Sequence, residues 1–392
     1  MSDHLEQWLN LTVRWLHVIV GIAWIGTSFY FNWLNSRIRA PDTPEEGVSG
    51  ELWSVHGGGF YRVVKYDVAP ARLPRTLHWF MWEAYATWIT GFGLLVLVYY
   101  FGAKAYLVRP EAGLSAGAAI AVGIGTLFAG WLVYDGLCRA LAARPAALSI
   151  VGFALAAAAA YGLTLVFSSR GAYIHVGAML GTIMAANVFR VIIPSQQEMV
   201  AAMAAGRAPD PARGAHAALR SLHNNYLTLP VLFIMISNHY PVTYGHRYNW
   251  AILAGIAVLG AATRHAFNLR NQGRSKPWLL PVAAAGMLAL ALVSAPRPRD
   301  DGVATVDDAE AHAIIERRCV PCHAETPTQP GFPAAPLGVR LDTMDDILRH
   351  ADRIAAVAVH TETMPLGNLT GMTDEERSAV GRWLRETVRS KE

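Results

Sequence analysis

Charged residues are scarce in this chain, and cysteines are almost absent. Lys, Arg, Asp and Glu make up 16% of the 392 residues, whereas about 25% is usual for a soluble domain. The three cysteines, Cys138, Cys319 and Cys322, are too few for a disulfide framework. No flavin or nicotinamide fingerprint occurs. The sequence therefore excludes a disulfide-rich secreted domain and gives no sign of a nucleotide cofactor.

The charges that are present divide the chain in two. Residues 300–392 carry 17 acidic and 10 basic side chains, whereas residues 1–299 carry 12 acidic and 23 basic ones. An apolar basic part followed by a polar acidic part predicts two domains in different surroundings. Loops that face an anionic membrane leaflet explain the basic part, so no nucleic-acid partner is expected.

Long apolar runs occupy the basic part. About 20 apolar residues in a helix cross the hydrocarbon core of a bilayer, and eight stretches qualify. We therefore predict an all-α polytopic membrane bundle of about eight spans in residues 1–296, a linker at 297–304, and a small globular domain at 305–392. The predicted spans are Leu11–Leu34, Leu77–Phe101, Leu114–Leu137, Ala146–Phe167, Ala172–Ile193, Leu219–His239, Tyr248–Phe267 and Pro277–Ala295.

The basic residues between these spans predict the orientation. The odd-numbered loops hold 15 Lys and Arg and the even-numbered loops hold 4, so the odd loops are expected in the cytoplasm. Both termini then face the other side. The first apolar stretch is too long for a signal peptide, which makes it the first span. We expect a multi-pass protein of the bacterial inner membrane, with the N-terminus and the C-terminal domain in the periplasm.

The C-terminal domain contains the sequence CVPCH, from Cys319 through Cys322 to His323. Two thiols at this spacing can form thioethers to haem c, and the adjacent His323 can bind the iron. A thioredoxin-like motif would need a βαβ setting and a zinc site would need more ligands; neither is seen. The sequence thus predicts a cytochrome c-type domain with covalent haem c. Met364 is the expected second axial ligand, with Met372 as the runner-up and core packing as the alternative role for Met364.

Histidines inside the predicted spans suggest a second haem. His17, His175 and His239 fall toward the outer face, where a haem b would lie near the haem c. For each of these histidines, the alternative is a hydrogen bond to a neighbouring helix or contact with headgroups. The first span also places Arg14, His17, Gly21, Trp24 and Ser28 on one helix face.

Other polar groups suggest a cavity within the bundle. Ionisable residues inside spans are costly and usually functional, and Glu83, Asp135, Asn187 and Arg190 fall in or near spans. The alternative for Asp135 and Arg190 is that they extend to the membrane surface. Three glycines near His56 predict either an anion-binding backbone or a flexible turn before an interfacial segment.

Several segments resemble the bacterial membrane-bound urate oxidase family, also called urate hydroxylase. The resemblance extends over essentially the whole chain. It includes the segments RWLHVIVGIAWIG (14–26), LHWFMWEAY (77–85), HVGAMLGTIMAANV (175–188), HNNY (223–226), SNHY (237–240), CVPCH (319–323) and MPLGNLTGMT (364–373). The opening segment is also similar to small haem-binding membrane proteins, which favours haem b at His17.

The resemblance implies oxidation of urate to 5-hydroxyisourate, with water as the oxygen source. Electrons would leave through haem c to a soluble or membrane cytochrome or a terminal oxidase. A planar purine anion requires a cation and a base, and on chemical grounds we take Glu83, Arg14 and Arg190 as candidate catalytic residues. Two other functions are compatible with the sequence: an electron-transfer subunit without substrate chemistry of its own, and a transporter with a redox domain.

Overall fold

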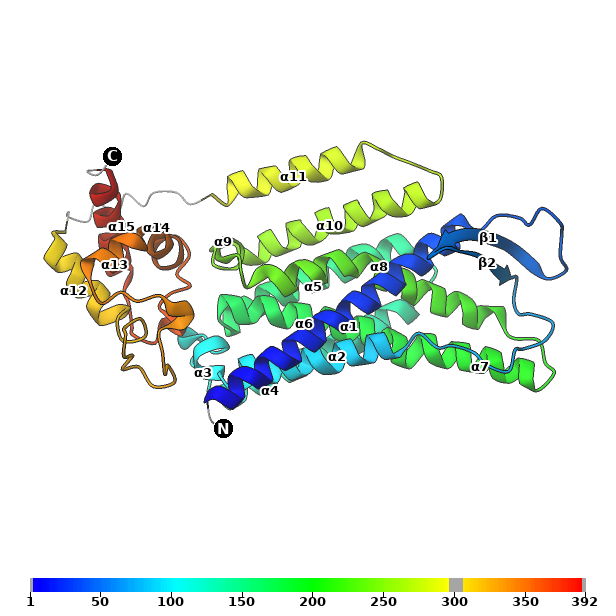
Figure 1. Ribbon diagram of the computed structural model, residues 1–392, viewed down its shortest axis with the longest axis horizontal. Coiled ribbons are helices and arrows are strands. Elements are labelled where there is room, and N and C mark those ends of the chain that lie inside the picture. The colour runs from blue at the N-terminus through cyan, green and yellow to red at the C-terminus, as the bar shows by residue number, and fades with distance from the viewer. Residues whose placement is uncertain (1–2, 296–305, 390–392) are drawn as a thin grey trace.

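The chain folds into a long helical bundle with a smaller helical domain at one end (Figure 1). The computed structural model describes residues 3–295 and 306–389, so the predicted linker at 297–304 lies outside the described residues. The bundle contains α1 (Asp3–Arg37), α2 (Trp82–Leu94), α3 (Ala103–Tyr106), α4 (Ala116–Ala140), α5 (Pro145–Val166), α6 (Ser169–Asn187), α7 (Ile193–Ala204), α8 (Pro211–Ser237), α9 (Pro241–Tyr244), α10 (Asn249–Asn271) and α11 (Leu279–Val293).

Two π-helical turns extend helices of the bundle. The turn η1 (Leu95–Tyr100) continues α2, and the turn η3 (Val188–Ile192) joins α6 to α7 without a break. In η3 the Ile193 N–H donates to the Val188 carbonyl, five residues back. Such turns often lie at functional positions, and η3 directly follows the buried side chain of Asn187.

A helix lies in each of the eight predicted spans, and five helical segments of the described chain are long and apolar enough to cross a membrane. These five are His4–Arg37, Ala116–Ala140, Pro145–Val166, Ser169–Ala204 and Asn249–Asn271. The α2 helix is short before its π turn, α8 contains Pro230 and many polar residues, and α11 has 15 residues.

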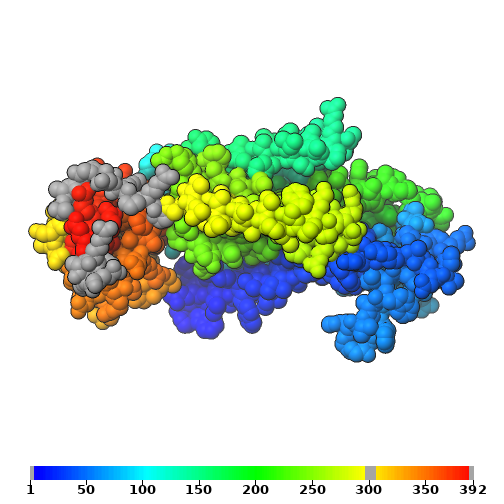
Figure 2. Space-filling view, turned by 90° about the horizontal axis from the view of Figure 1, so that it is seen from above, coloured from blue at the N-terminus to red at the C-terminus, as the bar shows by residue number. Residues whose placement is uncertain are grey.

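The outer surface of the bundle is apolar over several helices. Large side chains such as Ile22 on α1, Leu132 on α4 and Leu292 on α11 are about two-thirds exposed. Figure 2 shows α11 lying along one face of the bundle with its own outer side uncovered. Exposed apolar surface of this extent is unfavourable in water, so these helices are compatible with a membrane protein.

The first long loop forms a β-hairpin. Strands β1 (Val48–His56) and β2 (Gly59–Tyr66) pair in antiparallel fashion and lie at the end of the bundle opposite the C-terminal domain (Figure 1). Gly57 and Gly58 both have positive φ angles, which a two-residue hairpin turn requires. These glycines therefore make a tight two-residue turn, and anion binding by their backbone stays a prediction.

The centre of the bundle is held together by close packing of α4 against α6. A Cβ on Gly123 would lie 2.6 Å from His175 Nε2, and a Cβ on Gly130 would lie 2.4 Å from Met179 Cγ. Small residues on one helix thus accept large side chains of the next, as is common between helices in membranes.

The C-terminal domain consists of short helices around its own apolar core. It contains α12 (Asp308–Arg318), α13 (Met344–Arg349), α14 (Ala351–Ile354), the π turn η5 (Ala355–Val359) and α15 (Asp374–Arg389). The sequence predicts helices at 307–318, 345–360 and 373–389, the last beginning with a capping box of Thr373 and Glu376, and the three helices correspond to these elements. The predicted capping box is present: Glu376 N–H donates to Thr373 Oγ1 at 3.2 Å, and Thr373 N–H donates to Glu376 Oε2 at 2.9 Å.

Candidate functional site

The CVPCH segment forms a tight turn immediately after α12. Cys319 is the C-cap residue of that helix, and its carbonyl accepts hydrogen bonds from the N–H groups of Cys322 (3.1 Å) and His323 (3.0 Å). Neither cysteine is in a disulfide. The turn therefore holds both thiols and the imidazole on one short loop of the domain.

The ring of His323 is oriented by a backbone carbonyl. Its Nδ1 lies 2.9 Å from the carbonyl oxygen of Val339. Because a carbonyl oxygen can only accept, Nδ1 carries the proton and Nε2 keeps a free lone pair. This arrangement fixes the tautomer that a metal-binding histidine needs.

Burial makes both thiols weak acids. It raises the pKa of Cys319 to about 12 and also raises the pKa of Cys322. Attack on a disulfide requires a thiolate, so these thiols would be poor nucleophiles near neutral pH. The alternative of a thioredoxin-like motif is therefore disfavoured by the surroundings of the two cysteines.

Met364 lies beside the core that also contacts Cys319. Its side chain is half-buried against this core, whereas Met372 is buried within it. The Met364 backbone is fixed at both ends: its N–H donates to the Val357 carbonyl at 2.8 Å, and its carbonyl accepts from the buried Arg377 at 2.6 Å. Met364 is thus the more accessible of the two methionines considered as ligands.

The loop that carries Met364 contacts the bundle. A Cβ on Gly367 would lie 3.0 Å from the Ala105 carbonyl of α3, and a Cβ on Gly245 would lie 2.5 Å from Thr361 Cβ. Figure 1 shows α3 and α9 at the end of the bundle next to the C-terminal domain. The predicted haem ligand is therefore carried on the segment by which the two parts of the molecule meet.

His175 is fully enclosed near the same end of the bundle. Its Nδ1 donates to the Gly171 carbonyl at 2.8 Å, and its Nε2 accepts from Tyr100 Oη at 3.3 Å. Gly123 lies so close to Nε2 that no side chain fits between them, and both ring nitrogens of His175 have hydrogen-bond partners within the protein.

The other two histidines predicted to bind haem b have different surroundings. The His17 Nδ1 is 3.0 Å from Thr90 Oγ1, and the His17 ring packs on Gly91 of α2. His239 follows α8 and is exposed. No hydrogen bond or ring contact joins His17, His175 and His239 in the described structure, and a membrane haem stays a prediction.

A buried polar network lies near the far end of the bundle, toward the hairpin. Arg220 of α8 is 6% exposed and donates to Asp135 Oδ1 of α4 at 2.7 Å, and the exposed Arg139 binds the other oxygen of that carboxylate at 2.7 Å. Asn187 Nδ2 donates to Tyr134 Oη at 3.0 Å. The network thus joins α4, α6 and α8.

The same network continues along α8. Asn224 Oδ1 accepts from Asn187 Nδ2 at 2.8 Å, and Asn224 Nδ2 donates to the Met184 carbonyl at 2.9 Å. His223 Nδ1 lies 2.8 Å from Tyr134 Oη. Asp135 and Asn187, both predicted from the sequence to line a cavity, are therefore brought together by Arg220 and Asn224 of α8. The sequence alone does not single out these two α8 residues.

Two of the 15 basic residues counted for the odd-numbered loops, Arg220 and Arg264, lie inside helices and are buried. Arg220 lies inside α8, and Arg264 lies inside α10 and is 6% exposed. Arg220 lies four residues before Asn224, and Arg264 lies four residues before Asn268. This spacing places each pair on one helix face, which is the sequence signal that these arginines belong to the polar faces of α8 and α10. Without these two, the odd-numbered loops still hold far more basic residues than the even-numbered ones.

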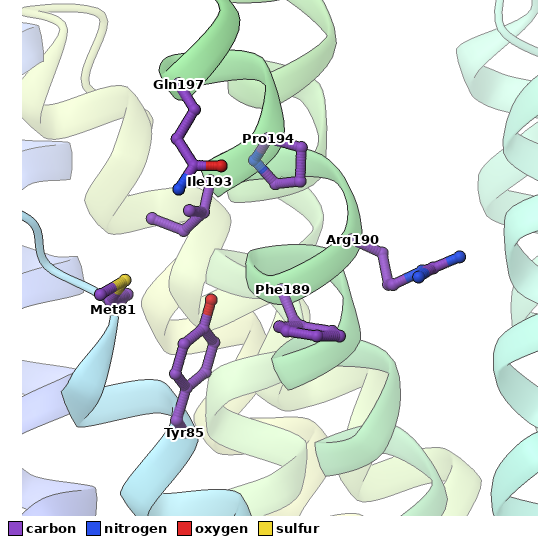
Figure 3. Close-up of a pocket in the computed structure, with 7 residues that line it drawn as sticks. All are labelled: Met81, Tyr85, Phe189, Arg190, Ile193, Pro194 and Gln197. Atoms are coloured by element: carbon purple, nitrogen blue, oxygen red, sulfur yellow. The ribbon is translucent and has the colours of Figure 1, made fainter.

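The three candidate catalytic residues do not form a site together. Arg14 is exposed and bonded to Asn10 of its own helix at 3.1 Å. Glu83 is half-buried, and its Oε2 is buried with no hydrogen-bond partner. Arg190 lines an open cavity of about 330 Å³, but Figure 3 shows its guanidinium directed away from Tyr85. No hydrogen bond or ion pair links Glu83, Arg14 and Arg190 among the described residues.

The described residues contain no group of three or more His, Cys, Asp or Glu side chains that could hold a metal ion. A haem would not produce such a group, because the porphyrin supplies most ligands and the protein adds only the axial ones.

These features define a helical protein with apolar helices compatible with a membrane, a buried arginine–amide network and a separate C-terminal domain. Residues 3–295 match the family model described as "Urate oxidase N-terminal". The protein belongs to this family, since the match covers most of the chain. The family indicates an oxidoreductase with a urate-related function. No curated protein and no solved structure gave a match.

Proposed function

We propose that this protein oxidises urate to 5-hydroxyisourate in the bacterial inner membrane. In this reaction urate and water give 5-hydroxyisourate, two protons and two electrons, so that the new hydroxyl oxygen comes from water. The electrons leave through covalent haem c to a cytochrome or a terminal oxidase. The family match over residues 3–295 supports the substrate, and the CVPCH turn supports the cofactor.

The contact of the Met364 loop with the bundle is the observation that carries this proposal. Gly367 lies against Ala105 and Gly245 lies against Thr361, so the domain with the CVPCH turn is held against the urate oxidase-type bundle. A chain that oxidises a substrate within its bundle needs its electron acceptor at such a contact.

The residues present fit haem c. Cys319 and Cys322 would hold the porphyrin through thioethers, and His323 and Met364 would be the axial ligands. When bound, haem c accepts and passes on single electrons, and a methionine ligand raises its potential. The chain's own contribution is to fix the His323 tautomer through the Val339 carbonyl and to hold both cysteines on the same short turn as His323.

The proposed orientation puts the C-terminal domain outside the cytoplasm. The N-terminal end of α1 lies at the same end of the bundle as the C-terminal domain, and the hairpin, which is part of the basic first loop, lies at the other end (Figure 1). This agrees with the distribution of basic residues in the loops. A covalent haem c domain outside the membrane could deliver electrons to a cytochrome there.

An anaerobic reduction experiment tests the function. The purified full-length chain is mixed with urate without oxygen, and the absorption band of reduced haem c is followed. Reduction together with formation of 5-hydroxyisourate is expected. If the band does not change until another protein is added, the chain is an electron-transfer subunit. Urate accumulation in vesicles without chemical change would indicate a transporter.

Two sets of variants test the cofactor. Replacing Cys319 and Cys322 with alanine should remove the haem that survives denaturing gels, and persistent haem staining would contradict covalent attachment. The substitution Met364→Leu should lower the haem potential, whereas Met372→Leu, at a buried core position, is the matched control. Equal potentials in the two variants would show that Met364 is not the ligand.

A further inference from the structure

A second cluster of the buried polar region lies between α8 and α10 and is incomplete. Asn225 Oδ1 accepts from Arg264 Nε at 3.1 Å and from Asn268 Nδ2 at 2.8 Å. The other ends of both amides, Asn225 Nδ2 and Asn268 Oδ1, are buried and have no hydrogen-bond partner within the described part of the chain. Buried polar atoms without partners cost free energy, so this cluster lacks one donor and one acceptor that a ligand could supply.

Arg264 also lacks a counter-charge. Among the described residues no carboxylate lies within 4 Å of its guanidinium, whereas Arg220 in the neighbouring cluster has Asp135 at 2.7 Å. The remaining contacts of Arg264 are uncharged: the Phe29 ring, whose centroid is 3.8 Å from Cζ, and Asn32 Oδ1 at 3.5 Å. Because arginine stays protonated in proteins and an unpaired buried charge is unfavourable, the cluster favours an anion.

We propose that Arg264, Asn225 and Asn268 bind a planar heterocyclic anion that carries lactam groups. The guanidinium would pair with the negative charge. Asn225 Nδ2 would donate to a ring carbonyl, and Asn268 Oδ1 would accept from a ring N–H. Phe29, whose ring the guanidinium covers, would hold Arg264 in place for this pairing.

This proposal rests on the proposed function, because it assigns the urate of that reaction to one place in the bundle. The residues are substrate-binding residues, and no proton or electron transfer is assigned to them. Arg264 lies two turns before the end of α10, at the hairpin end of the bundle (Figure 1). With the orientation proposed above, the anion would reach this cluster from the cytoplasm.

Xanthine is a suitable probe, because it is a planar lactam purine that can be bound without the urate reaction. Its binding to the full-length chain is measured by calorimetry at a pH where xanthine is partly ionised. Arg264→Gln should raise the dissociation constant at least tenfold, and Arg264→Lys, which keeps the charge, should raise it less. Arg270→Gln, at an exposed position of the same helix, is the matched control and should bind like the wild type.

A second variant guards against simple misfolding. Asn268→Asp puts a negative charge beside Arg264 and removes the hydrogen bond to Asn225 Oδ1, so xanthine binding should weaken, and the melting temperature of the free protein shows whether the variant is folded. A stable Asn268→Asp or Arg264→Gln variant that binds xanthine like the wild type would overturn the site.

The site and the reaction can fail separately. Wild-type protein that binds xanthine through Arg264 but leaves urate unchanged would overturn the proposed function and support the site. If the wild type and Arg264→Gln both oxidise urate and have the same KM for it, this result would overturn the site and support the function.

Discussion

Gly245 of the bundle lies so close to Thr361 of the C-terminal domain that a Cβ on the glycine would be 2.5 Å from Thr361 Cβ. Overpacking of such a contact costs about 1–3 kcal/mol. We expect Gly245→Ala to weaken the contact and to slow the anaerobic reduction of haem c by urate several-fold. Gly117→Ala, where the new Cβ meets nothing within 4 Å, is the control. Equal reduction rates in the two variants would show that this contact does not matter for electron delivery.

A pair of glycines on α4 offers an internal comparison of packing. A Cβ on Gly123 would lie 2.6 Å from His175 Nε2, whereas one on Gly125 would meet nothing within 4 Å. We therefore expect Gly123→Ala to lower the melting temperature of the detergent-solubilised protein. Gly125→Ala should leave it unchanged or raise it slightly, because alanine favours the helix by about 1 kcal/mol. The packing described for His175 would be contradicted by equal melting temperatures.

Asp135 binds two arginines in different surroundings. Arg220 is buried and Arg139 is 79% exposed, although both lie 2.7 Å from the carboxylate. Removing the charge of Asp135 in an Asp135→Asn variant leaves Arg220 buried without a charged partner and should cost about 3–5 kcal/mol. Arg139→Gln removes only a surface contact and should cost less than about 1 kcal/mol. Thermal or denaturant unfolding in detergent measures both, and similar losses would contradict this asymmetry.

Glu376 makes the stability of the C-terminal domain dependent on pH. Burial raises the pKa of this carboxyl, but hydrogen bonds from Arg318 and the Thr373 backbone, with the charges of Arg318 and Arg317, outweigh burial and lower the pKa below 4.5. A lowered folded pKa contributes stability above the unfolded value, and this contribution is lost as the pH falls through the folded pKa. The domain should therefore lose stability in acid below about pH 4.5.

Hydrogen exchange of α12 and α15 in the full-length chain measures this effect. Glu376→Gln keeps the hydrogen bond to the helix start but removes the charge, so its protection should be lower than that of the wild type near pH 7 and should change less toward acid. Glu386→Gln, at an exposed position of the same helix, is the control at each pH. If the protection of Glu376→Gln changes with pH in parallel with that of Glu386→Gln, Glu376 does not cause the pH dependence of the domain's stability.

Apolar runs and capping signals allowed most helices to be predicted. A helix lies in each predicted span, and the Thr373–Glu376 capping box is confirmed, because both features depend on local sequence. The hairpin at residues 48–66 was not predicted, although its Gly57-Gly58 turn is a recognised hairpin signal. Residue type alone favours either an anion-binding backbone or a flexible turn for these glycines, and only the alternation of the flanking strands would have indicated a hairpin.

The arrangement of the polar side chains was harder to predict than the helices. The sequence indicates Asn187 and Asp135 as polar residues of the bundle, but it leaves their partner Arg220 among the basic residues of a loop. The reason is physical: an arginine near a helix end can extend to the surface or pair within the bundle, and only the neighbouring helix decides between these outcomes. The separation of Arg14, Glu83 and Arg190 has the same origin, since the sequence does not fix which helix faces meet.

The π turn between α6 and α7 gives neighbouring residues of one continuous helix opposite surroundings. Asn187, just before the turn, is buried among polar side chains of α4 and α8, and Arg190, within it, faces outward. A π turn holds one residue more than the α-helical pitch requires. Deleting a single residue from Val188–Ile192 would rotate everything after it by about 100°, carrying Ile193 out of the interior while leaving Asn187 in place. Which side chains of α7 face the interior of the bundle thus depends on that one extra residue.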